Sequence, residues 1–216
     1  MIKEIRPFIC IAYILEIYPG TRLYLDFQKR TKTTDDIWLK RIEGICYFET
    51  DPSMTQERVM AFGEKIRHAV YENIPLFIDS LHLIDDREFF TMHGEFCSRL
   101  AMTLSHGDYR KIAAISNKKK AAERLFKKAL AYAPDHRAYL GLGLLGQDKG
   151  NFQDAVEVLT KGVAHFPQSE ELHLCLGINL MNLGRFQDAL RCLARFEDVP
   201  QARYYITECE RALSEG

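Results

Sequence analysis

The chain has 216 residues, with 29 Lys and Arg against 30 Asp and Glu, so its formal net charge is −1. Hydrophobic residues make up 47% and charged residues 27%, which is typical of a globular protein of one or two domains and excludes disordered, collagen-like and small disulfide-scaffold proteins. The near-zero charge gives no overall attraction to nucleic acid or to an anionic membrane surface.

The cysteines and the apolar segments indicate the compartment. The six cysteines lie at least 17 residues apart, without a CxxC pair, and are expected to be buried free thiols of a reduced protein. The longest apolar stretch, residues 8–17, is shorter than the roughly 20 residues of a membrane helix. The first seven residues also lack the order of a secretory signal. We therefore expect a cytoplasmic protein without a membrane span.

Residues 8–17 are rich in β-branched and aromatic residues and predict one buried strand. Pro19 and Gly20 suit the centre of a tight turn, and Thr21 is placed to cap a short helix over residues 22–30. The strand has three alternatives: pairing with the apolar residues 46–48, pairing between two chains, or packing on the later helices. We favour local pairing or a homodimer, because a lone strand leaves backbone groups unpaired.

A helix is predicted after these segments. Residues 53–56 form a capping-box pattern that opens a helix to about residue 70. Its apolar residues recur at helical spacing, which predicts a core stripe rather than a cofactor pocket. The stripe consists of Val59, Phe62, Ile66 and Val70.

The order of these segments resembles the end of radical S-adenosylmethionine (radical SAM) enzymes. The resemblance lies in residues 16–24, 35–38 and 47–52, and it covers roughly residues 1–80. The subgroup that this part is similar to binds cobalamin and includes the anaerobic magnesium-protoporphyrin ester cyclases. The resemblance implies that residues 1–87 are the remnant of a barrel end plus linking helices. It also implies that one turn lies near the parent enzyme's cofactor, and this turn comprises Tyr18, Pro19, Gly20 and Thr21.

The chain departs from that family where the family's chemistry resides. Radical SAM enzymes bind a 4Fe-4S cluster through a CxxxCxxC loop, and the cobalamin-binding subgroup adds a DxHxxG sequence, but neither pattern occurs here. We therefore expect no cofactor in this chain and no radical chemistry from it alone. The alternative is an accessory part of a radical SAM/cobalamin enzyme, whose turn contributes to a S-adenosylmethionine site completed by upstream sequence.

Residues 88–105 predict a helix, followed by an insertion at about residues 112–120. The insertion and the helix after it are strongly basic, with Glu123 as the single acid. Because no aromatic residues are interleaved for base stacking, a solvated loop and outer helix face are favoured over a nucleic-acid site. The basic residues are Arg110, Lys111, Lys118, Lys119, Lys120, Arg124, Lys127 and Lys128.

The second half of the chain is repetitive. Residues 150–155 recur as residues 184–189 at an offset of 34, and Leu142-Gly143 recurs as Leu176-Gly177 at the same offset. Small residues allow close helix packing, and glycines and prolines end the helices. These repeats are similar to the tetratricopeptide repeat (TPR), a 34-residue pair of antiparallel helices. The fold prediction is mainly α: a TPR-like α-α superhelix over residues 88–216 with a C-terminal capping helix, preceded by a short α/β segment.

The TPR resemblance implies a groove lined by the first helices of successive pairs. The groove lacks the Lys, Arg and Asn set that clamps a terminal carboxylate in chaperone-binding TPR proteins, so we expect a hydrophobic protein or peptide partner, or the parent enzyme's own barrel. The alternative is that its leucines pack within the superhelix. The groove residues are Arg137, Leu140, Leu144, Gln147, Glu171, Leu174, Ile178, Met181 and Asn182.

Histidine and cysteine pairs are the remaining candidates for chemistry. His93 and Cys97 share a helix face, and His173 lies two residues from Cys175. Two ligands do not complete a metal site, so core or surface histidines are favoured and no metal is expected. The sequence therefore predicts a non-catalytic interaction module, with enzymatic activity left open because it depends on sequence outside the chain.

Overall fold

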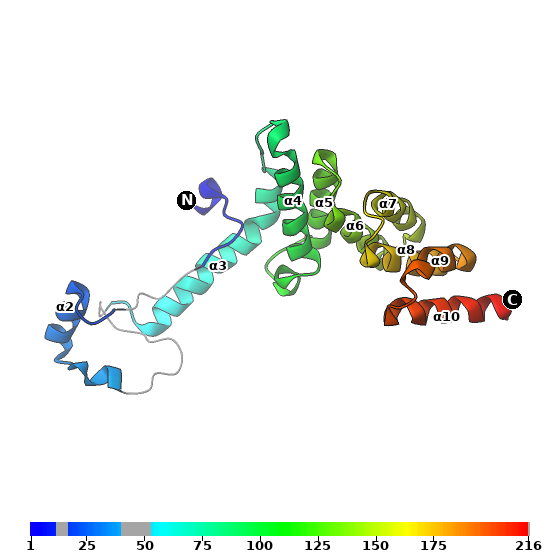
Figure 1. Cartoon of the computed structure of the whole chain (residues 1–216). Helices are drawn as coiled ribbons and strands as arrows, with labels where there is room; N and C mark the ends of the chain where they lie inside the picture. Colours follow the sequence, from blue (N-terminus) through cyan, green and yellow to red (C-terminus); the bar gives the residue numbers. More distant parts are fainter. Residues whose placement is uncertain (12–16, 40–52, 216) are drawn as a thin grey trace. The chain divides into compact units, whose positions relative to one another are not determined.

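A computed structural model describes residues 1–11, 17–39 and 53–215 (Figure 1). Within these ranges all regular structure is helical, so the mainly α prediction is confirmed and the short α/β segment is not found. Contacts divide the chain into two units, residues 1–77 and 78–216, with the boundary inside helix α3 (Gln56–Asp79). In the described ranges, no helix has the length and apolar content that crossing a membrane requires.

The N-terminal unit contains α1 (Ile2–Ile5), α2 (Arg22–Thr31), η1 (Asp35–Leu39) and most of α3. Helix α2 begins as predicted. Thr21 Oγ1 accepts a hydrogen bond from the Tyr24 backbone N–H at 3.2 Å and donates to the Tyr18 carbonyl at 2.8 Å. Gly20 adopts a φ of 83°, a conformation that glycine reaches without strain. The turn therefore caps α2.

A buried tyrosine fixes η1 to α2. The Tyr24 side chain is 1% exposed, and its hydroxyl donates to Asp35 Oδ1 at 2.7 Å and accepts from Trp38 Nε1 at 2.9 Å. Gln28 Nε2 donates to the same carboxylate oxygen at 2.9 Å. Burial and the neighbouring Asp35 raise the pKa of Tyr24, so its hydroxyl stays protonated as the donor.

In this unit one prediction lies largely outside the described residues, and another needs correction. Residues 8–11 have no regular structure, while residues 12–16 and the proposed pairing partner 46–48 lie outside the described residues. A short β-branched run does not determine a strand by itself, because ladder hydrogen bonds require a second strand. Helix α3 begins at Gln56, the last residue of the predicted capping box, and ends at Asp79 rather than near 70. Thr55 is its cap, since the Arg58 backbone N–H donates to Thr55 Oγ1.

The C-terminal unit is a row of helical pairs. Successive helices pack against each other, and α4 also contacts α6, α6 contacts α8, and α8 contacts α10 (Figure 1). The predicted helix over 88–105 and the capping helix are confirmed. The elements are η2 (Arg87–Phe89), α4 (Phe90–Ser105), η3 (Asp108–Lys111), α5 (Lys118–Tyr132), α6 (His136–Asp148), α7 (Phe152–His165), α8 (Glu170–Asn182), α9 (Phe186–Leu193), η4 (Ala194–Phe196) and α10 (Pro200–Ser214).

The same close contact recurs in two pairs. A Cβ atom added at Gly143 would lie 2.6 Å from Leu159 Cδ2, and one added at Gly177 would lie 2.8 Å from Leu193 Cδ2. Both leucines are fully buried. Because such distances are shorter than any normal carbon contact, a side chain at either position would force the leucine or the helices to shift. The 34-residue offset in the sequence therefore relates two equivalent glycine–leucine contacts in the structure.

The glycines and prolines that were expected to end helices lie at helix ends, with one exception. Gly150 and Gly184 have φ values of 75° and 71° just after α6 and α8, as expected for glycines that end helices. Pro134 and Pro167 follow the ends of α5 and α7. Pro200, however, is the first residue of α10, a position where proline is tolerated because the missing N–H would have no partner within the helix.

Candidate functional site

The predicted groove residues lie on α6 and α8, which pack against each other. Arg137, Glu171 and Asn182 are exposed. Half-buried positions lie between them and combine apolar side chains with one amide. This second group consists of Leu140, Leu144, Gln147, Ile178 and Met181.

Leu174 differs from the other residues of the set. It is 9% exposed and packs in a core cluster with Leu193 and Ala202, which belong to α9 and α10. The C-terminal helix covers the position that the repeat pattern assigns to the groove. Leu174 is therefore part of the core. We call the remaining eight predicted residues on these two helices the α6–α8 face.

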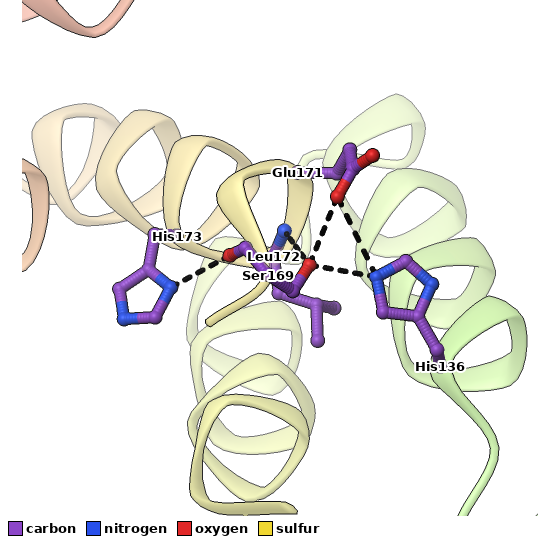
Figure 2. A network of polar contacts seen from close by, with 5 residues as sticks. All are labelled: His136, Ser169, Glu171, Leu172 and His173. Carbon is purple, nitrogen blue, oxygen red and sulfur yellow. Dashed lines mark hydrogen bonds and ion pairs between the residues drawn. The ribbon is translucent and has the colours of Figure 1, made fainter. Parts of the chain in front are cut away.

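The N-terminus of α8 is linked to that of α6 by a polar network, which Figure 2 shows. His136 Nε2 lies 2.6 Å from Ser169 Oγ, which donates to Glu171 Oε2 at 3.0 Å and accepts from the Leu172 backbone N–H at 3.2 Å. His173 Nδ1 lies 2.7 Å from the Ser169 carbonyl. The pKa of Glu171 is lowered because its carboxylate accepts hydrogen bonds from the Glu171 backbone N–H and from the Ser169 hydroxyl. The network therefore fixes the ends of both helices and holds one carboxylate of the α6–α8 face.

A buried amide connects the same helices near the other end of α6. Asn179 is fully buried, and its Nδ2 donates to the Cys175 carbonyl at 2.7 Å and to Gln147 Oε1 at 3.3 Å. Burial raises the pKa of the Cys175 thiol to about 12, so it remains a weak neutral donor 3.9 Å from Gln147 Oε1. Gln147 is one of the predicted groove residues, whereas Asn179 is not among them. The available signal was an amide side chain four positions after Cys175, within the otherwise apolar stretch 174–181.

The turn at residues 18–21 is a helix cap in the structure. The Thr21 hydroxyl accepts a hydrogen bond from the first turn of α2, and Tyr18 is 57% exposed. A hollow of about 250 Å³ lies nearby on α2 itself, lined by Leu23, Asp26, Phe27 and Arg30. A contribution of this turn to a S-adenosylmethionine site stays a prediction.

The histidine and cysteine candidates lie inside the packing. His93 is 7% exposed, with Nε2 2.9 Å from the Ile84 carbonyl, and Cys97 is fully buried. Burial raises the pKa of the Cys97 thiol, which keeps it protonated and unreactive. Among the described residues, no group of three or more His, Cys, Asp or Glu side chains could hold a metal ion.

The basic stretch is largely engaged within the C-terminal unit. Lys118 Nζ donates to the Arg110 and Ile112 carbonyls at 2.9 and 2.7 Å, which ties the loop after η3 to α5. Lys119 pairs with Asp148 at 2.7 Å, Arg124 with Asp79 at 2.8 Å, and Lys128 Nζ donates to the Leu81 carbonyl at 2.8 Å. Lys118 to Lys120 form the first turn of α5 and are not part of the insertion, which comprises the residues between α4 and α5.

Glu123 is the centre of the remaining pairs. Lys127 Nζ lies 2.7 Å from one of its oxygens and Lys149 Nζ lies 2.6 Å from the other. These two ammonium groups lower the pKa of Glu123 to about 2. The carboxylate therefore links the middle of α5 to the end of α6.

Comparisons with known proteins agree with the helical pairs. One family model described as tetratricopeptide repeat matches residues 116–170, and a second with the same description matches residues 147–205. A search of curated proteins and a search of solved structures gave no match. Neither family model reaches residues 1–115, so the radical SAM resemblance in that part stays a prediction. Over residues 116–205, the helical pairs therefore match the tetratricopeptide repeat in sequence as well as in helical arrangement.

Proposed function

We propose that this chain is a non-catalytic scaffold that binds a protein or peptide segment along the α6–α8 face. The observation that carries the proposal is the packing of α6 on α8, which joins the predicted residues of two repeats into one face. Half-buried Leu144, Ile178 and Met181 supply apolar contact area. Exposed Arg137 and Asn182 supply polar contacts at its edge. This combination suits an amphipathic segment whose apolar side chains lie over α6 and α8.

The face is also prearranged for binding. The Ser169 network and the Gln147–Asn179 pair fix α8 relative to α6 at both ends. A partner that binds a fixed surface orders few side chains of the scaffold and loses less entropy on association. The fixed arrangement of α6 and α8 supports a binding mode in which the scaffold does not rearrange.

The proposal is tested by photo-crosslinking from the full chain. A photoreactive phenylalanine analogue placed at Ile178 should form an adduct with a discrete partner, whereas the same residue at exposed Ala164 on α7 should not. The purified partner should then bind the Ile178→Glu variant at least tenfold more weakly, because a glutamate there replaces an apolar contact with a charge. Ala164→Glu is the matched control, since it adds the same charge on α7.

Two results would contradict the proposal. One is equal crosslinking from both positions, which would place the partner elsewhere. The other is a partner whose affinity is the same for Ile178→Glu and the unmodified chain, provided that both have the same helical content. Folding of each variant is verified by circular dichroism at 222 nm.

The parentage suggested by residues 1–80 forms a separate question. The proposal of a radical SAM parent, with its 4Fe-4S cluster, S-adenosylmethionine and cobalamin, requires a CxxxCxxC loop in sequence upstream of Met1. Iron and sulfide analysis after anaerobic reconstitution tests the non-catalytic role directly. A stoichiometric four-iron cluster on this chain would refute that role.

A further inference from the structure

A groove crosses the end of α6 between α5 and α7. It consists of two adjoining hollows of about 130 and 570 Å³, which share Glu123 and Lys149 as lining residues. The smaller hollow is lined by residues of α5, α6 and α7, and the larger one by the first turn of α5 and by Lys149. We call this feature the outer groove, because none of its lining residues belongs to the α6–α8 face.

The floor and the rim of the outer groove differ in chemistry. The floor is apolar, with Leu145 and Ala155 closing it from below and the half-buried Leu142 and Val158 at its surface. The rim is basic and carries the carboxylates Glu123 and Asp154. The rim lysines are Lys118, Lys119, Lys120, Lys127 and Lys149.

The rim retains capacity for further carboxylates. Lys127 and Lys149 each direct one bond to Glu123, and an ammonium group has three donors. Lys120 is exposed and makes no ion pair within the described residues of the chain. Exposed ion pairs such as Lys119–Asp148 are weak, so an incoming carboxylate can share or replace them.

The start of α5 strengthens the positive potential. Its first turn has three lysines and no acidic residue, and the side chain of its N-cap, Asn117, makes no capping hydrogen bond. Lysines at this end of a helix are unfavourable because the backbone dipole is also positive there. A bound anionic segment would relieve that repulsion.

We propose that the outer groove binds an acidic protein segment that carries an apolar residue among its carboxylates. The carboxylates contact the lysine rim, and the apolar side chain covers Leu142 and Val158. A small inorganic anion would leave this apolar floor uncovered. Nucleic acid is less suited, because the lining contains no aromatic residue for base stacking. The inference is independent of the α6–α8 face, so either can fail while the other stands.

The probe for the test is a fluorescein-labelled ten-residue peptide of glutamates with one central leucine, measured by fluorescence anisotropy against the full chain. It should bind, and its affinity should fall at least tenfold between 50 and 300 mM salt, as expected for contacts between exposed charges. Lys120→Glu should weaken binding about three- to tenfold, and adding Lys149→Gln should weaken it further. Lys161→Glu, an equal charge reversal at an exposed position of α7 outside the groove, should change the affinity less than twofold.

Matched probes decide between the alternatives without altering the protein. Replacing the glutamates by glutamines should abolish binding, and replacing the leucine by glycine should weaken it. If Lys120→Glu and Lys161→Glu lower the affinity for the peptide equally, binding reflects general charge attraction and the proposal is overturned. Equal affinity for the leucine and glycine peptides, or tighter binding of a ten-nucleotide single-stranded DNA, would overturn it as well. Circular dichroism confirms that each variant keeps its helical content.

Discussion

Gly143 lies where α6 and α7 approach each other, and the effect of one added methyl group there can be worked out from the packing. A Cβ atom would lie 2.6, 2.7 and 2.8 Å from three atoms of the fully buried Leu159 side chain. Carbon atoms normally approach to about 3.5–4.0 Å, so Leu159 must leave its rotamer or the helices must separate. Such overpacking costs about 1–3 kcal/mol, and the better helix propensity of alanine returns about 1 kcal/mol. Gly143→Ala should therefore lower the free energy of unfolding by about 1 kcal/mol.

The sign of the effect should reverse when the obstructing side chain is removed. Leu159→Ala alone should cost about 2–5 kcal/mol through the cavity it leaves. In that background the Gly143→Ala methyl group enters vacated space and should stabilise the fold by about 1 kcal/mol. Urea denaturation of the four proteins, followed at 222 nm, measures the cycle, and constant m values ensure that the transitions are comparable. If Gly143→Ala has the same effect in both backgrounds within about 0.5 kcal/mol, the close contact does not exist.

Three further predictions concern the core, the cap and the Glu123 pair. Leu174→Lys should lower the free energy of unfolding by more than about 3 kcal/mol, because it buries an ammonium group without a partner. Thermal melts followed by circular dichroism test this, and an unchanged melting temperature would place Leu174 on the surface. Ser169→Ala should cost about 1 kcal/mol in urea denaturation, since it removes the cap of α8, while Ser169→Thr should keep most of that stability. Because the pKa of Glu123 falls from 4.5 to about 2 on folding, its contribution is present above pH 4.5 and is lost as the pH falls toward 2. The unfolding free energy should therefore decrease more steeply over that range for the unmodified chain than for Glu123→Gln, and parallel curves would contradict the ion pairs.

The repeats could be predicted because their main contacts join residues that are close together in the sequence. Gly143 meets Leu159 and Gly177 meets Leu193 within a single helical pair, so the residues that pack together also recur together. The helix-ending glycines are local signals of the same kind. Residues 8–17 carry no comparable signal, because a strand requires a distant partner that a single apolar run does not identify.

The candidate site was predictable only in part, since burial depends on the neighbours of a repeat. Leu140 and Leu174 occupy equivalent positions 34 residues apart, yet Leu140 is half-buried, whereas Leu174 is buried against Leu193 of α9 and Ala202 of α10. The basic stretch shows the same limitation. Counting charges reveals a positive segment, but not that Lys119 meets Asp148 or that Lys149 meets Glu123 across 26 residues. These pairings follow from the superhelix and not from local sequence.

The contact between Trp38 and Tyr24 has a practical consequence for following the two units separately. Trp38 is the single tryptophan of the chain, and its indole N–H is bonded to the buried Tyr24 hydroxyl in the N-terminal unit. Its emission spectrum therefore reports the solvation of that unit alone, whereas the far-ultraviolet signal is dominated by the repeats. Recording both signals during one denaturant titration shows whether the units lose structure in a single cooperative step or in succession.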